Sequence, residues 1–170
     1  VNLKQLNVSN FNTSKVVDMT SMFYGCQKLQ NLDVSSFNTS NVTSMNGMFT
    51  ACEGLSNIDL SGFDTSNVLD MSIMFAGCVN IKTLDLSSFN TSKVNNMSSM
   101  FDGLYNLTTI YVSNLWSIAN LTDSTSNMFG SSPKLVGGAG TACDGENNID
   151  ATYARIDGGT SAPGYFTAKV

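Results

Sequence analysis

The chain repeats itself with a period of 26 residues. Related motifs of the form Met-Phe-x-x-x begin at Met22, Met48, Met74, Met100 and Met128, the last after a two-residue insertion. A fixed period of this length is typical of stacked repeat units and argues against a globule built around one site. Because no single unit can bury its own apolar residues, we expect successive copies to lie in register.

Composition narrows the classes of function. Charged residues make up only 12% of the chain, the net charge is −5, and there is no histidine. A nucleic-acid partner needs clustered Lys and Arg, and insertion into a membrane needs a long apolar stretch, so we expect neither. Without histidine the common acid–base, nucleophile and metal arrangements are missing. We therefore predict no enzyme, no catalytic residue, no metal site and no cofactor.

One repeat, residues 29–54, illustrates the expected local structure. Apolar and polar residues alternate around Leu32 and Val34, which predicts a short strand with one buried face. The Asn-Thr-Ser segment at 38–40 predicts a polar turn that caps a helix. The spacing of the next apolar residues predicts one face of a short helix. They are Val42, Met45, Met48 and Phe49.

Stacking of such units predicts continuous apolar columns. One column is Phe11, Phe37, Phe63 and Phe89; a second is Leu6, Leu32, Ile58, Leu84 and Ile110; a third is Phe23, Phe49, Phe75, Phe101 and Phe129. The nine methionines fall on two repeat positions beside these columns. A methionine stripe can form an adaptable binding surface, but its helical spacing beside phenylalanine favours core packing.

Two further rows have competing explanations. A threonine row could order water or bind ice, but its place in the expected turn favours helix capping. Its members are Thr13, Thr39, Thr65 and Thr91. Cys26, Cys52 and Cys78 share one repeat position that also accepts Leu104, which indicates a small buried apolar group. We predict no disulfides.

The repeat resembles a known family. The pattern Leu-x-x-Leu-x-Val-x-x-Phe at residues 29–37, and above all LDLSSFNTSKVNNMSSMFDG at residues 84–103, resembles the bacterial surface protein 26-residue repeat, a BspA-like leucine-rich repeat. The resemblance covers residues 1–132. It implies an α/β fold: a right-handed leucine-rich-repeat solenoid with short parallel strands on the concave face and short helices on the convex face. It also implies an extracellular or bacterial cell-surface location.

The pattern decays toward the C-terminus. We expect residues 1–132 to form an array of five repeats and residues 133–170 to form an irregular capping segment. Its aromatic and aliphatic residues would pack over the last repeat, because a stack needs closed ends. These are Tyr153, Ile156, Tyr165 and Phe166. We also expect further repeats or domains of the same longer chain before Val1.

The outward positions of the predicted strands are the candidate binding residues. Asp33, Asp59 and Asp85 would form an acidic ladder with about 4.8 Å between parallel strands. Asn31, Asn57 and Tyr111 would line the same concave face. The ladder could be a weak calcium site, a receptor for a basic ligand, or a solvated consensus residue. Calcium needs six to eight oxygen ligands in a closed arrangement, which favours the last explanation.

These observations support two hypotheses for the function. In the first, the chain is a non-enzymatic adhesion module of a bacterial surface that binds a host protein, a glycan or a neighbouring cell through its concave face. In the second, it is a spacer or a fibre component with no ligand of its own. The near-identity of the outward positions between copies supports the second, since an irregular protein partner would demand variation from copy to copy.

Overall fold

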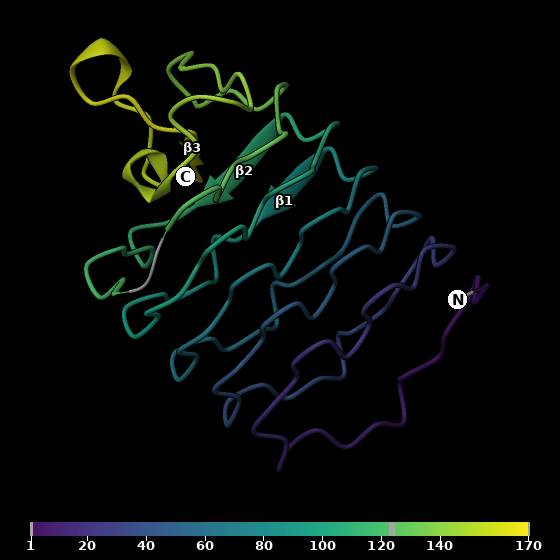
Figure 1. Cartoon of the computed structure of the whole chain (residues 1–170). Helices are drawn as coiled ribbons and strands as arrows, with labels where there is room; N and C mark the ends of the chain where they lie inside the picture. Colours follow the sequence, from purple (N-terminus) through teal and green to yellow (C-terminus); the bar gives the residue numbers. More distant parts are fainter. Residues whose placement is uncertain (1, 123–124, 170) are drawn as a thin grey trace.

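The chain forms successive irregular coils that end in a small parallel sheet (Figure 1). The computed structural model describes residues 2–122 and 125–169. Its strands are β1 (Thr83–Asp85), β2 (Thr109–Val112) and β3 (Phe166–Ala168). Two 3₁₀ helices, η1 (Ala151–Tyr153) and η2 (Gly159–Ser161), lie in the C-terminal segment. The other described residues form loops and turns.

The predicted leucine-rich-repeat solenoid with helices is therefore wrong. The segments expected to be helical, such as residues 42–49, contain turns and no α-helix. Strands form in only two of the five copies, at β1 and β2. In the second copy, the segment that was predicted to be a strand still alternates between buried and exposed residues. Leu32 and Val34 are buried, and Asp33 is exposed.

Hydrogen bonds to the next coil explain why the helices do not form. The backbone N–H of Phe23 donates to the carbonyl of Met48 at 2.9 Å, and that of Phe49 donates to Met74 at 3.0 Å. A helix would need these donors for a carbonyl four residues earlier. Isolated parallel bridges join the same segments, at Asp18, Ser44, Asp70 and Asn96. Each coil therefore uses its amides to hold the coil that follows it in the sequence.

Backbone geometry also excludes a helix in these segments. Each of the five segments has two residues at positive φ, four positions apart, as at Ile73 (49°) and Gly77 (72°). An α-helix requires negative φ at every residue. Gly25, Gly77 and Gly103 take the left-handed conformation that glycine often adopts just after a helix. They take it inside a run of consecutive turns.

Apolar columns fill the interior, as the spacing predicted. The rings of Phe23, Phe49, Phe75, Phe101 and Phe129 stack with centroids 5.6–6.1 Å apart. Phe37, Phe63 and Phe89 are buried, while Phe11 in the first coil is 49% exposed. All the methionines except Met22 are buried. The predicted core is thus confirmed from the second coil onward except at Ile58, which is only partly buried, and the first coil leaves part of its apolar surface open.

The threonine row lies inside the molecule and joins neighbouring coils. Thr39 is 1% exposed, its hydroxyl donates to the carbonyl of Asp64 at 2.9 Å, and it accepts from the N–H of Asp64 at 2.9 Å. Thr13 bonds Asn38 in the same two ways. Because these hydroxyls are buried, they cannot order surface water or ice. The helix-capping explanation is also wrong, because the described residues that follow these threonines form turns and no α-helix.

The cysteine row joins coils in a similar way. The thiols of Cys52 and Cys78 donate to the carbonyls of Phe23 and Phe49 at 3.1 and 3.0 Å. Burial raises the pKa of the Cys52 thiol to about 11 and that of Cys78 to about 12. Both are therefore protonated donors at neutral pH. Cys26, Cys52, Cys78 and Cys143 all carry free thiols.

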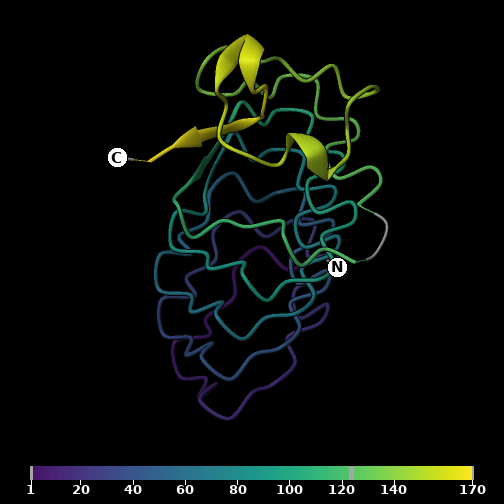
Figure 2. The same ribbon diagram turned by 90° about the vertical axis from the view of Figure 1, so that its left-hand side faces the viewer.

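The C-terminal strand completes the sheet beside β2. Leu135 is buried and the N–H of Val136 donates to Thr108, but the chain then turns away, and Val136 forms an antiparallel bridge with Ala142. Strand β3 pairs with β2 in parallel, with Phe166 opposite Ile110. The sheet order is β1-β2-β3. Figure 2 shows this segment lying across one end of the stacked coils.

Aromatic residues of the C-terminal segment pack against the last coil. Tyr165 and Phe166 are buried and contact Phe129 edge-on, with ring centroids 5.1 and 5.8 Å away. Tyr153 is partly buried and stacks on Tyr165. Ile156 is 43% exposed, so the expectation that it packs over the last repeat is wrong.

Candidate functional site

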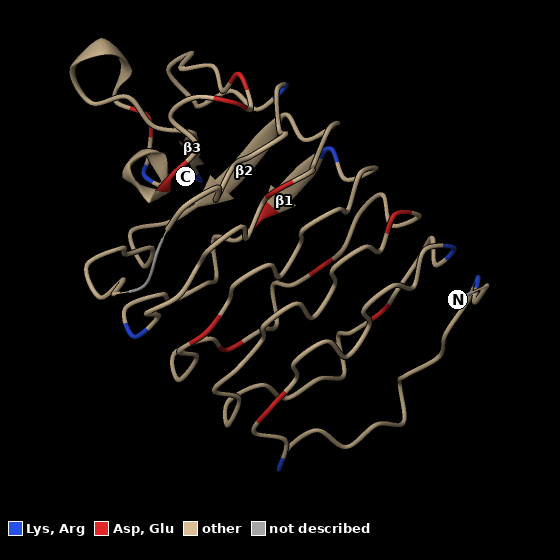
Figure 3. Ribbon diagram, viewed as in Figure 1, with Lys and Arg blue, Asp and Glu red and all other residues tan. Residues whose placement is uncertain are grey.

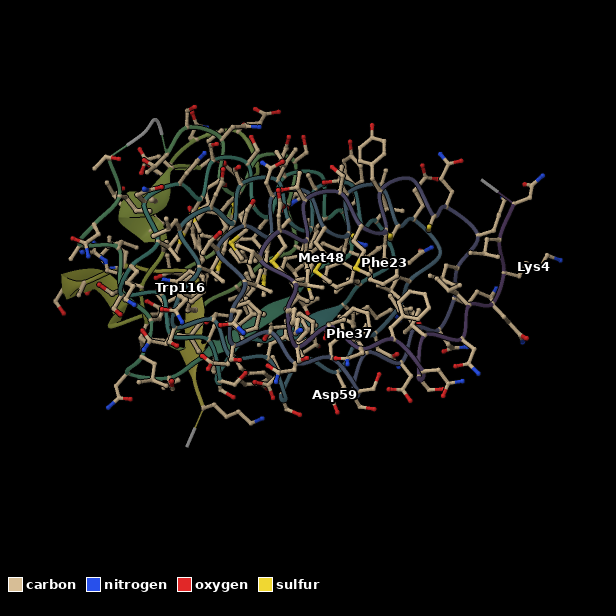
Figure 4. The ribbon with its side chains drawn as sticks, turned by 90° about the horizontal axis from the view of Figure 1, so that it is seen from below. Lys4, Phe23, Phe37, Met48, Asp59 and Trp116 are labelled. Atoms are coloured by element: carbon tan, nitrogen blue, oxygen red, sulfur yellow. The ribbon has the colours of Figure 1, made fainter. Side chains whose placement is uncertain are left out.

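The candidate binding residues lie along the side of the stack that carries β1 and β2. We call this set the aspartate face; it consists of Asn31, Asp33, Asn57, Asp59, Asp85 and Tyr111. Asp85 and Tyr111 are direct register partners of β1 and β2. Figure 4 shows Asp59 pointing outward, whereas Phe23, Phe37 and Met48 point into the interior. Alternation along the extended segments thus places the aspartates outside.

One oxygen of each aspartate shapes the local turn. The Oδ1 atoms of Asp33, Asp59 and Asp85 accept from the N–H two residues later, at Ser35, Ser61 and Ser87, over 2.9, 2.9 and 3.1 Å. In the first coil Asn7 accepts from Ser9 in the same way at 2.9 Å. An asparagine can therefore replace the aspartate in this turn without loss of the hydrogen bond.

The aspartates of this row are ionised at neutral pH. Hydrogen bonds from Ser35 lower the pKa of Asp33, and hydrogen bonds from Ser61 lower that of Asp59. Repulsion from Asp85 and Asp33 acts in the opposite direction on Asp59 but is the weaker effect. Asp33 and Asp59 are exposed. The face therefore presents adjacent negative charges to solvent, on a surface where Figure 3 shows few charged residues.

Lys169 forms an ion pair with Asp85 at one end of the aspartate row. Burial opposes ionisation of Asp85, but its bonds from Lys169 and Ser87 outweigh burial and lower its pKa. Both side chains stay partly exposed, at 48% for Lys169 and 41% for Asp85. An exposed pair of this kind contributes little to stability. The ion pair balances the negative charge of Asp85 near β3. Asp33 and Asp59 therefore carry the remaining negative charge of the three aspartates.

The remaining candidates differ in their surroundings. Asn31 and Asn57 are exposed, and Tyr111 is half-buried on β2. A hollow of about 510 Å³ lies beside Asn31 and Asp33 and is also lined by Gln5, Leu6 and Asn7. The structure thus brings Asn31 and Asp33 to a concavity, while Asp59 lies on an open part of the face. Among residues 2–122 and 125–169, no group of three acidic or sulfur-bearing side chains could hold a metal ion.

Sequence reasoning did not identify a set of asparagines whose side chains hydrogen-bond one coil to another. The side-chain Nδ2 of Asn41 donates to the carbonyl of Ser14, and that of Asn67 donates to Ser40. At a second position of the repeat, Asn80 and Asn106 donate in the same way to the backbone carbonyls of Glu53 and Val79. The signal was available, because asparagine recurs at these two positions of the repeat. These side-chain amides therefore hydrogen-bond neighbouring coils together.

Trp116 contacts the C-terminal segment. Its Nε1–H donates to the carbonyl of Ala154 at 3.1 Å, and its ring contacts Phe166 edge-on at 5.0 Å. It therefore joins the last coil to the C-terminal segment. Part of the ring also lines a pocket that sequence reasoning did not predict.

The comparisons identify a family. The family described as "Mycoplasma protein of unknown function, DUF285" matches residues 1–111 and again residues 31–139. The chain belongs to this family. No curated protein and no solved structure is similar to it in these comparisons. No helix in the described part of the chain is long and apolar enough to cross a membrane.

Proposed function

We propose that the chain is a non-enzymatic recognition module of a bacterial surface protein of the BspA-like kind, and that it binds a protein or glycan on a host or neighbouring cell. The aspartate face is the contact surface. The observation that carries the proposal is that Asp33 and Asp59 are exposed and ionised, on the side of the hydrogen-bonded coils that also carries Asp85. Such a preorganised surface loses little conformational entropy on binding.

The chemistry of the row indicates the partner. The Oδ1 atoms of Asp33 and Asp59 each accept a backbone N–H in their turns, and both carboxylates are exposed to solvent. Carboxylates at this spacing suit Lys or Arg side chains of a protein, through charge-assisted hydrogen bonds. They also suit sugar hydroxyls, which can donate to the same oxygens.

A charge-removing variant tests the proposal. The triple change Asp33→Asn, Asp59→Asn, Asp85→Asn keeps the turn acceptor, as Asn7 does in the first coil, and removes the negative charge. We expect binding to immobilised host matrix proteins or cells to fall at least about tenfold, since each lost charged hydrogen bond weakens binding. The thermal unfolding midpoint should change little. Binding that stays unchanged in the folded variant would contradict the recognition proposal.

The alternative proposal is a spacer or fibre component. The observation that favours it is that Asp33, Asp59 and Asp85 make the same bond to a serine two residues later, so the row also has a purely local role. A spacer would show no binding in the same assay, in either the original chain or the variant. A fibre component would show concentration-dependent association in analytical ultracentrifugation.

A further inference from the structure

We propose a second binding site, for a small carboxylate with an apolar body, in a pocket between the last coil and the C-terminal segment. The pocket has a volume of about 320 Å³. It is lined by Val112, Ser113, Asn114, Trp116, Ile118, Ala154, Arg155 and Ile156. Pockets for small ligands begin at about 300 Å³, so a ligand with one ring or one branched aliphatic group fits this volume.

The walls of the pocket suit the apolar part of such a ligand. Uncharged side chains form the walls, and they belong to Trp116, Ile118 and Val112. Ile156 lies at the rim and keeps 43% of its surface exposed. The Trp116 indole N–H is already bonded to Ala154, so the ring offers only apolar surface to a ligand. Its contact with Phe166 fixes the orientation of the ring. This wall is therefore preformed.

We infer that the ligand carries an anionic group because the pocket contains Arg155, the only arginine of the chain. Arg155 is one of the residues that line the pocket, and its Nε–H donates to the carbonyl of Pro163 at 2.8 Å, which restrains the side chain. The two terminal nitrogens have no bond to the described residues and can pair with a carboxylate. Arg155 is also the only charged residue in the lining. Asn114 beside it makes no side-chain hydrogen bond to the described residues and can donate a further bond.

Trp116 provides a direct test, since it is the only tryptophan of the chain. Phenylacetate is titrated into the whole chain while tryptophan fluorescence is recorded, with the neutral isostere phenylacetamide as the matched ligand. We expect a saturable change with phenylacetate and a Kd on the order of 1 mM, as for other ligands of about ten heavy atoms. Phenylacetamide should bind at least about tenfold more weakly, because it cannot form the charged pair.

Two variants and a salt series complete the test. Arg155→Gln should reduce phenylacetate affinity about tenfold and abolish the preference over phenylacetamide, whereas Arg155→Lys should keep part of that preference as a point charge. Raised salt should weaken phenylacetate binding to the original chain. No saturable signal, or equal binding of the two ligands, would overturn the proposal. The salt series and the two-ligand comparison decide the question even if Arg155→Gln fails to fold.

Discussion

Replacing Phe75 by alanine should lower the free energy of unfolding by about 4 kcal/mol, which is the usual cost of a large-to-small change at a fully buried phenylalanine. Phe75 lies in the middle of the stacked column and is fully buried. Its ring stacks on Phe49 at 5.7 Å and on Phe101 at 6.1 Å, nearly parallel to both. The change would remove two ring contacts and leave a cavity between coils. Urea or thermal unfolding of the whole chain measures the effect.

Tyr105→Ala is the matched control for this change. Tyr105 belongs to the neighbouring coil but is 53% exposed. Its removal should change the free energy of unfolding by no more than about 0.5 kcal/mol. Equal costs for the two aromatic residues would show that the phenylalanine column does not form the core. A cost confined to Phe75 supports a continuous interior that runs through the coils.

Asp157→Asn should destabilise the C-terminal segment by about 3 kcal/mol, because it disrupts a buried, fully bonded carboxylate. Asp157 is 8% exposed. Its Oδ2 accepts from the N–H groups of Ala139 and Thr141, both at 2.9 Å, and its Oδ1 accepts from the Thr141 hydroxyl and the Gly159 N–H. An asparagine must turn its own NH₂ donor toward one of these pairs of donors. Thermal unfolding at neutral pH measures the loss.

The pH dependence of stability gives the same prediction an independent check. Burial alone would raise the pKa of Asp157, but the bonds from Thr141, Gly159 and Ala139 outweigh burial and lower the pKa to about 2. The unfolded value is about 3.9. The stabilisation is therefore complete above about pH 4 and is lost as the pH falls toward 2. The gap in stability between the original chain and Asp157→Asn should shrink over this range.

Asp64→Asn serves as the control for Asp157→Asn. Asp64 is exposed, and asparagine occupies the equivalent positions of the neighbouring copies, where Asn38 and Asn90 make the same bond to a serine two residues later. This change should leave the unfolding midpoint almost unaltered. If Asp157→Asn were as harmless as Asp64→Asn, the buried carboxylate would have no structural role.

The buried core and the outward direction of the aspartates could both be predicted from the sequence. Both depend only on the 26-residue period and on which residues are apolar enough to be buried. Phe49, Phe75 and Met48 are buried in the predicted columns. Asp33 and Asp59 are exposed as predicted. These features follow from the alternation of apolar and polar residues, whatever backbone conformation carries it.

The helices could not be predicted correctly from that pattern. The spacing of Val42, Met45, Met48 and Phe49 fits one face of a helix, but a run of turns buries the same four residues. Whether this segment forms a helix or a run of turns depends on where the backbone N–H groups of Met45 and Phe49 donate. Both donate to carbonyls of the coil that follows. One signal against a helix was present: Gly47 lies inside the proposed helix and adopts a φ of 60°.

The pocket beside Trp116 was beyond sequence reasoning for a different reason. It forms only because residues 154–156 return to the last coil, far along the chain from residues 112–118. No periodic pattern joins these two segments. The same is true of β3, which pairs with β2 although the two strands are far apart in the sequence.

Coils donate backbone amides to the coils that follow them, and this stacking places the aspartates on one side of the molecule. NMR detection of couplings across hydrogen bonds tests this claim at single atoms. We expect the amide nitrogen of Phe49 to couple to the carbonyl carbon of Met74, and that of Phe75 to couple to Met100. Couplings from Phe49 to Met45 and from Phe75 to Met71 would instead reveal helices within single repeats, and would contradict the account.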